Sequence, residues 1–256
     1  MAEDFKNHVL RAIKSNVRFD GRTNDQYRKT TIDYDVSWTA EGSARVSIGN
    51  TVILAGVKLS LDKPYPDTPD SGMLMIESNL LPLASPLFES GPPGIDSIEL
   101  ARVIDRGVRE SHAIDLDGLC VEKGEKVWFV TVDICTVNVD GNLFDASSLA
   151  VMAALQHTVF PSIEDGVIDY KKKTSKKLPL KECPIAVTIW KVGDTLVVDP
   201  SQVEESVFES RLTVTSTEDG TIVAMQKGGD APLTQADVER MVDMAIAKAA
   251  ELRKTL

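Results

Sequence analysis

Two stretches of this chain share one order of elements: several strand-like segments and then one helix-like segment. In the first stretch the helix is predicted at about residues 146–157, and in the second it is predicted from Thr234 to about Lys254. The strand-like segments are TIDYDVSW, GSARVSIG, TVILAGVKLS and KVWFVTVDICTVNVD in the first stretch, and PIAVTIWKV, TLVVD, RLTVTST and TIVAMQK in the second. Because the strands gather before each helix, we predict an α+β fold with two halves of similar construction, mixed sheets and flanking helices.

The connection between the halves, about residues 163–180, is polar, lysine-rich and without periodicity, so we predict an exposed loop. It separates a first half of about 1–162 from a second half of about 181–256, and we treat 1–256 as one domain. The run KKKTSKK is able to attract RNA by releasing counterions, although a solvated loop is the usual structure for such a run.

Local signals place several further elements. We predict a short helix at residues 3–15, a tight hairpin turn at Gly49-Asn50, and irregular connections through the proline-rich residues 62–97. A helix capped by Asp96-Ser97 is expected to run to about His112. Thr234 and Asp237 resemble a capping box at the start of the last helix.

The composition excludes several classes of function. The 256 residues contain no apolar run close to the roughly 20 residues of a membrane span, and the charged first residues do not form a signal peptide, so we expect a cytoplasmic protein. The 3 cysteines and 3 histidines are scattered, so neither a disulfide framework nor a zinc site is indicated. A net charge of -11 argues against a general polyanion-binding surface, and nucleic acid must be bound at a local basic patch.

Several motifs, taken in order, are similar to the RNase PH superfamily over nearly the whole chain. They are RFDGR at 18–22, GSARVSIGNTVILAGVK at 42–58, IELARVIDRGVRE at 98–110, VVDPSQVEES at 197–206 and MQKGG at 225–229. The segments DKPYPDTPDSG, ESGPPG and IELARVIDR more narrowly resemble the non-catalytic ring subunit of the archaeal exosome. This resemblance implies an RNase PH-type fold and a hexameric ring of three heterodimers that degrades RNA from its 3′ end with phosphate as the attacking group. In RFDGR, we expect Arg18 and Arg22 to lock a tight turn.

Both parts of the chemical site that the resemblance implies are degenerate here. Active relatives hold phosphate with a turn of small residues, serine or threonine, and arginine before a helix, and the matching turn here contains Asn142, Leu143 and Phe144. Leucine and phenylalanine side chains neither donate a hydrogen bond to phosphate nor neutralise it. Of the acidic motif of active relatives the chain keeps Asp199, Glu204 and Glu205, but Pro200 and Ser201 stand in the stretch between them, so at least one usual carboxylate is absent. We therefore expect VVDPSQVEES to be a solvated turn after an interior strand, with no catalytic residue and no metal.

The helix ELARVIDRGVRE places Arg102, Arg106 and Arg109 on one stripe, opposite its apolar residues. Arginines in a row suit successive phosphates of one RNA strand. The alternative is that they form ion pairs within the helix with Glu99 and Asp105. The resemblance assigns Arg102 and Arg106 to RNA, whereas Arg109 has less support and is suited to an ion pair instead.

We expect a chain that is inactive alone, assembles with the catalytic RNase PH-like subunit, and helps to bind and position single-stranded RNA. The resemblance further implies RNA-binding cap proteins as partners, no membrane, and no cofactor on this chain, with phosphate and a divalent metal used at the partner's active site. Two alternatives stay open at this point: a self-sufficient phosphate-dependent 3′ exoribonuclease, and a ring scaffold without RNA contact.

Overall fold

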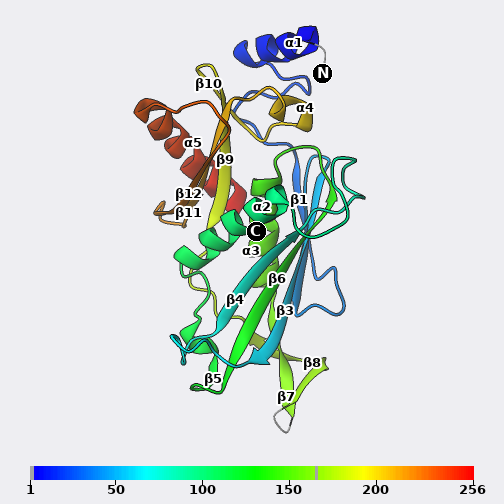
Figure 1. Cartoon of the computed structure of the whole chain (residues 1–256), viewed down its shortest axis with the longest axis vertical. Helices are drawn as coiled ribbons and strands as arrows, with labels where there is room; N and C mark the ends of the chain where they lie inside the picture. The colour runs from blue at the N-terminus through cyan, green and yellow to red at the C-terminus, as the bar shows by residue number, and fades with distance from the viewer. Residues whose placement is uncertain (1–2, 165–166) are drawn as a thin grey trace.

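The larger of the two main sheets lies in the first part of the chain. The structure is a computed structural model that describes residues 3–164 and 167–256 (Figure 1). In this sheet the strand order is β1-β2-β3-β6-β4, with the short β5 beside β6. The strands are β1 (Thr30–Tyr34), β2 (Gly42–Ile48), β3 (Thr51–Asp62), β4 (Met73–Asn79), β5 (Cys120–Glu122) and β6 (Lys126–Asn138). The sheet is mixed, because β4 runs parallel to β6 while the other pairs are antiparallel.

The smaller sheet belongs to the second part of the chain and is antiparallel. Its strand order is β10-β9-β11-β12. The strands are β9 (Ile185–Val192), β10 (Thr195–Val198), β11 (Ser210–Ser216) and β12 (Ile222–Gly228). Helix α5 (Gln235–Arg253) packs on β9 and β11, and its buried residues Met241, Ala245 and Ala249 form the apolar stripe predicted from the sequence.

Helix α3 (Leu143–Gln156) lies between the two sheets and is the centre of the hydrophobic core. It packs on β2 and β3 of the larger sheet and on β9 of the smaller one, and its residues 145–155 are all buried. Alanine and serine at many positions let both sheets approach the helix closely. Helix α2 (Ile95–Glu110) packs beside it, against β4 and β12. The α+β class and the mixed sheets predicted from the sequence are therefore confirmed.

The amino-terminal helix α1 (Glu3–Lys14) lies at one end of the molecule, beside β10 and the short helix α4 (Gln202–Glu205) (Figure 1). Val9 and Ile13 are buried in a separate apolar cluster with Val192, Val197 and Val207. The remaining short element is the 3-10 helix η1 (Asp117–Leu119). Within the described ranges, 3–164 and 167–256, no helix is long and apolar enough to cross a membrane.

The prediction of a loop across the lysine-rich connection was wrong. Strands β7 (Val159–Glu164) and β8 (Val167–Lys177) form an antiparallel hairpin there, and residues 165 and 166 lie outside the described residues. The strand lacks an apolar period because it belongs to a two-stranded ribbon whose exposed side chains have no core to face. Thr174 Oγ1 donates to the carbonyl of Phe160 at 2.7 Å and fastens the two strands together. The division of the chain into two halves within one domain stays a prediction.

The predicted helix ends were partly correct. Thr234 and Asp237 form a reciprocal capping box at the start of α5, as predicted. The cap predicted for α2 was wrong, because Gly94 precedes the helix without a side-chain bond and the Ser97 hydroxyl donates to the carbonyl of Ser78 instead. The hairpin turn at Gly49-Asn50 is confirmed by the pairing of Ile48 with Thr51.

Candidate functional site

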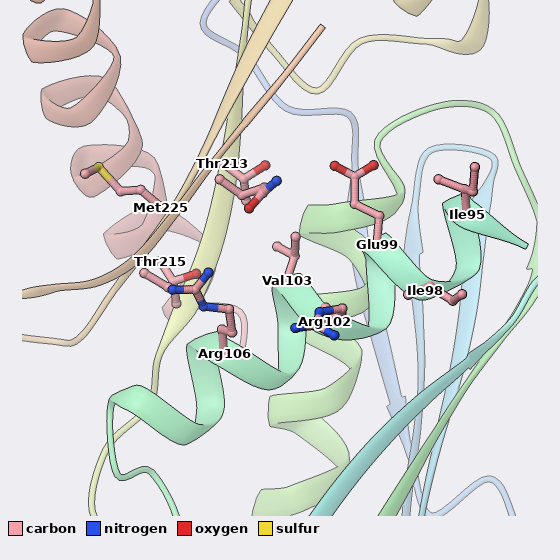
Figure 2. A pocket seen from close by; sticks show the side chains of 11 residues that line it. Ile95, Ile98, Glu99, Arg102, Val103, Arg106, Thr213, Thr215 and Met225 are labelled. Atoms are coloured by element: carbon pink, nitrogen blue, oxygen red, sulfur yellow. The ribbon is translucent and has the colours of Figure 1, made fainter. Parts of the chain in front are cut away.

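Arg102 and Arg106 lie on the side of α2 that faces strand β11 (Figure 2). They line a pocket of about 480 Å³ together with Thr213 and Thr215 of β11 and Met225 of β12. Figure 2 shows the Arg106 side chain extending toward Thr215. The pocket thus combines two cationic side chains with hydroxyl and apolar groups.

The packing of α2 fixes the position of these two arginines. Leu100, Ile104 and Val108 are buried on the other side of the helix, in the main core. Gly107 faces β11 so closely that a Cβ atom there would lie 2.9 Å from Thr215 Cγ2. The lack of a side chain at this position lets the arginine-bearing turn approach the strand.

The acidic neighbours of Arg102 and Arg106 are bound to other arginines. Glu99 accepts a hydrogen bond from Arg211 Nη2 at 2.7 Å, and Asp105 accepts one from Arg109 Nη2 at 2.7 Å. Neither Arg102 nor Arg106 forms an ion pair or hydrogen bond with any residue that the structure describes. Their charges are therefore available to a ligand.

Arg109 is separated from the other two arginines of the predicted stripe. It lines a different pocket, with His112 and Lys181, and its guanidinium also donates to the carbonyl of Leu74 at 3.0 Å. The bonds to Asp105 outweigh the effect of burial and raise its pKa further. The RNA-binding role predicted for Arg109 stays a prediction, and its observed contacts are those of an ion pair within the helix.

The turn that corresponds to a phosphate site brings Asn142, Leu143 and Phe144 to the start of α3. Asn142 is the N-cap residue in the left-handed conformation (φ 57°), and its backbone N–H donates to Glu205 Oε1 at 2.7 Å. A carboxylate of the chain itself thus occupies the helix amino terminus, where an anion is favoured. Gly141 allows this approach, since a Cβ atom there would lie 2.4 Å from the carbonyl oxygen of Pro200.

Leu143 and Phe144 line a small cavity of about 180 Å³ beside this turn. The guanidinium of Arg211 lies 4.8 Å from the centre of the Phe144 ring and 5.6 Å from that of Trp190. Arg211 is thus held by two aromatic faces and by Glu99. The other ionisable side chains that line the cavity are the carboxyl groups of Asp96, Glu99 and Glu205, which offer a phosphate no cationic donor.

Asp199 is fully buried, and both of its carboxylate oxygens are engaged by donors of the chain. Oδ1 accepts from Arg28 Nη2 at 2.6 Å and from Asn142 Nδ2 at 2.9 Å. Oδ2 accepts from Arg22 Nη1 at 2.9 Å and from the backbone N–H and Nε of Arg28 at 2.7 and 2.9 Å. The carboxylate therefore has no free position for a metal ion.

The rest of the acidic segment is also built into the fold. Ser201 caps α4 in a reciprocal box with Glu204, whose carboxylate accepts from Arg18 Nε at 2.9 Å. Arg18 also donates to the carbonyls of Val198 and Asp199, at 2.9 and 2.7 Å. The prediction of a solvated turn for VVDPSQVEES was wrong, because Asp199 and Glu204 are the partners of arginines from the RFDGR segment. Glu205 is bound by the backbone N–H of Asn142. Within that segment Arg22 Nε donates to Asp20 Oδ2 at 2.7 Å, as expected for a locked turn.

Two buried carboxyl groups near this network have shifted pKa values. Burial raises the pKa of Glu205 to about 7, against the opposing effects of the Asn142 N–H, Arg211 and Arg28. Burial likewise raises the pKa of Asp145 to about 7, although the Tyr27 hydroxyl donates to it at 2.5 Å. Both carboxyl groups lie beside the turn at the start of α3. Glu205 accepts a hydrogen bond from the backbone N–H of Asn142, and Asp145 accepts hydrogen bonds from Tyr27 and Thr188.

Family comparison joins both parts of the chain to one group of enzymes. Residues 26–161 match the model for domain 1 of the 3′ exoribonuclease family (RNase PH), and residues 182–248 match the model for domain 2. The chain belongs to the 3′ exoribonuclease family. The resemblance drawn from the motifs, and the RNase PH-type fold it implied, are therefore confirmed.

Relatives within this family cover the chain from end to end. The exosome complex component Rrp42 of Methanosarcina mazei is 45% identical over 248 residues, which are 97% of this chain and 91% of that protein. Rrp42 of Thermoplasma acidophilum is 46% identical over 254 residues, 99% of this chain and 95% of that protein. A chain in the Archaeoglobus fulgidus exosome with RNA bound to the active site is 47% identical and superposes with a TM-score of 0.91, over 98% of this chain and 97% of that chain.

The family implies a phosphate ion and a divalent metal, and the residues of this chain do not fit either group. Asp199 is saturated by arginine and amide donors, Ser201 caps a helix, and Glu205 bonds to Asn142. Among the described residues, no group of three or more His, Cys, Asp or Glu side chains is arranged to hold a metal ion.

Sequence reasoning missed the arginines that surround these sites. Arg28 donates three hydrogen bonds to the Asp199 carboxylate, whereas Arg22 donates one. Arg211 binds the Glu99 carboxylate, which sequence spacing had paired with Arg102. No spacing in the sequence links position 28 to 199 or 211 to 99, because the partners come from different halves of the fold. The one available signal was the acidic segment itself, since buried carboxylates require cationic partners.

Proposed function

We propose that this chain is a non-catalytic ring subunit of an archaeal-type exosome, which helps to bind RNA for 3′ to 5′ phosphorolysis by a catalytic neighbour. Relatives at 45 and 46% identity are named exosome complex component Rrp42, and a 47% identical chain comes from an exosome with RNA bound to the active site. The chain belongs to the same family over both of its halves.

The proposal rests on the contrast between the start of α3 and the pocket of Arg102 and Arg106. The position at the amino terminus of α3 that would receive the attacking phosphate is taken by the Glu205 carboxylate and bordered by Leu143 and Phe144. By comparison, Arg102 and Arg106 line an open pocket without a partner among the described residues. A chain of this kind is equipped to hold RNA but not to cleave it.

The partners follow from this function. The catalytic RNase PH-like subunit pairs with this chain in a heterodimer, and three heterodimers close the ring, which carries RNA-binding cap proteins and works in the cytoplasm. Phosphate and a divalent metal act at the catalytic subunit's site. Arg102 and Arg106 contribute by fixing the scissile region of single-stranded RNA, and positioning alone supplies several kcal/mol of a barrier.

The first experiment measures phosphate-dependent release of nucleoside diphosphates from an RNA oligonucleotide. It compares the purified chain, the catalytic sibling and the co-purified pair. We expect no release by this chain alone and faster release by the pair than by the sibling. Release by this chain alone at a rate comparable to the pair contradicts the proposal and favours a self-sufficient exoribonuclease.

The second experiment replaces Arg102 and Arg106 by alanine in the co-purified pair. Since each guanidinium that neutralises a single-stranded RNA phosphate contributes about 0.7 to the salt slope of log K, the double variant should lower that slope by about 1.4. The control is Arg45→Ala, which removes an exposed arginine that is bound to Asp33. Unchanged affinity and salt slope in the double variant indicate a ring scaffold without RNA contact.

A further inference from the structure

A second surface, rich in lysines, lies at the end of the molecule opposite α1, where the β7–β8 hairpin projects from the larger sheet (Figure 1). It is formed by this hairpin and by residues 35–41, which connect β1 to β2. Trp38 in this connection is 98% exposed, more than any other large apolar side chain of the described residues. A tryptophan that packs on nothing in the chain is available to an external ligand.

Two lysines hold the Trp38 segment against the hairpin. Lys58 Nζ of β3 donates to the carbonyl of Thr39 at 2.8 Å, and Lys173 Nζ of β8 donates to the carbonyl of Ala40 at 2.9 Å. Lys58 Nζ also lies 4.7 Å from the centre of the Tyr170 ring, which is half-exposed. The contacts therefore bring Trp38, Tyr170 and lysines of two strands to one surface.

The positive charge of this surface is concentrated in the segment KKKTSKK of β8, which contains five lysines. The Lys171, Lys173 and Lys177 side chains form no ion pair with a carboxylate of the described residues, whereas Lys58 is bound to Glu41. Lys172, in the same run, pairs with Asp169 at 3.7 Å. Since the net charge of the chain is -11, this run of lysines is a local feature of the hairpin. Such a cluster attracts polyanions at short range despite the overall charge.

The combination of aromatic faces and lysines fits single-stranded nucleic acid better than a protein partner. Bases stack on exposed aromatic rings while lysines track the phosphates, independently of sequence. Cores of protein interfaces are enriched in tryptophan and tyrosine but depleted of lysine. Here lysines bind the backbone carbonyls of the two residues that follow the exposed tryptophan, which favours RNA.

We propose that Trp38, Tyr170 and the β8 lysines form a second binding surface for single-stranded RNA, separate from the pocket of Arg102 and Arg106. This inference rests on the proposed function only in taking RNA as the substrate of the complex. The Trp38 ring stacks on a base, and Lys171 and Lys173 contact the adjoining phosphates. The surface holds a part of the strand distant from the 3′ end.

The test measures affinity for a labelled single-stranded uridine oligonucleotide in the co-purified ring, without phosphate so that the RNA stays intact. Trp38→Ala should weaken binding by about 5- to 150-fold, the range for loss of one base–aromatic stack. Trp38→Phe should retain most of the affinity, because phenylalanine also offers a ring face. Lys171→Ala should reduce the salt slope by about 0.7. Tyr65→Ala and Lys63→Ala, exposed residues outside this surface, are the matched controls.

The outcomes separate this inference from the proposed function. Repeating Trp38→Ala in a ring that also carries Arg102→Ala and Arg106→Ala should give the same fold-loss, even where the arginine changes themselves have no effect. Unchanged RNA affinity of the Trp38→Ala ring overturns the inference. Loss of ring assembly or of cap-protein binding by Trp38→Ala also overturns it, because the surface would then be a protein interface.

Discussion

Asp199 shows how a catalytic-looking carboxylate becomes part of the architecture. The resemblance drawn from the sequence implied a metal-binding acidic motif at this position, whereas here Arg22, Arg28 and Asn142 donate hydrogen bonds to both carboxylate oxygens. Arg22 and Arg28 come from the segment before β1, and Asp199 follows β10, so the bonds fasten the beginning of the chain to its second half. The residue therefore contributes to stability.

Replacing Asp199 by alanine should destabilise the fold strongly. Removing one partner of a buried ion pair leaves uncompensated charge, here on Arg22 and Arg28, and costs about 3–5 kcal/mol. Urea unfolding of the isolated chain measures this change. Asp70→Ala, which breaks an exposed ion pair with Lys123, should cost less than about 1 kcal/mol. Equal stabilities of the two variants would contradict the structural role of Asp199.

The raised pKa of Glu205 predicts that the free energy of unfolding depends on pH. Burial raises its pKa from the usual 4.5 to about 7, so between these values the folded chain keeps a proton that the unfolded chain has lost. The free energy of unfolding therefore decreases as the pH rises through this window. Asp145, whose pKa is also raised to about 7, acts in the same direction.

Glu205→Gln should reduce this pH dependence, because the amide oxygen still accepts the Asn142 N–H and does not titrate. Between about pH 5 and about pH 8 the decrease in unfolding free energy should be smaller in the variant by up to about 3 kcal/mol. Urea unfolding at several pH values measures it, with Glu125→Gln as an exposed control. Parallel pH profiles of Glu205→Gln and the unchanged chain would refute the raised pKa of Glu205.

At the scale of elements, strong local signals predicted what the structure contains. The apolar stripe and the Thr234–Asp237 box predicted α5, and the Gly49-Asn50 turn predicted the β2–β3 hairpin. Where the deciding interactions are distant in sequence, prediction failed. β8 is a strand because it pairs with β7, and the Ser97 hydroxyl is taken by the carbonyl of Ser78, so it does not cap α2.

The candidate site shows the same limit. Helical spacing correctly placed Arg102 and Arg106 on one face of α2, because that geometry is local. Helical spacing did not show that Glu99 is bound by Arg211, which lies on strand β11. The buried state of Asp199 was equally hidden, since it depends on arginines about 170 positions away.

The arginines of helix α2 are expected to have different roles: Arg109 stabilises the fold, whereas Arg102 and Arg106 bind RNA. Arg109 bonds through two nitrogens to Asp105 and donates to the carbonyl of Leu74, so Arg109→Ala should cost about 1 kcal/mol of stability. Its effect on RNA affinity in the assembled ring should be smaller than that of Arg102→Ala. Thermal unfolding and RNA titration of both variants provide the measurements. A loss of RNA affinity as large as that of Arg102→Ala would return Arg109 to the RNA-binding set.

At the scale of the whole molecule, the pocket of Arg102 and Arg106 lies next to exposed apolar surface. Ile95, at the start of α2, is 84% exposed and borders this pocket, and it also lines the neighbouring pocket that includes Leu87. If the two arginines hold RNA in a neighbour's active site, that neighbour must approach this rim. Apolar side chains of this size are then buried on assembly.

Ile95→Asp should therefore weaken association with the catalytic sibling, because the new carboxylate would lose its hydration in the contact. The isolated variant should unfold at the same temperature as the unchanged chain, since the side chain packs little within it. Val167→Asp, at an exposed position of the β7–β8 hairpin, is the matched control and should assemble normally. Sedimentation of each chain mixed with the sibling distinguishes heterodimers and rings from free subunits. Normal ring formation by Ile95→Asp would place the subunit boundary elsewhere, and Arg102 and Arg106 would then need another route to the RNA.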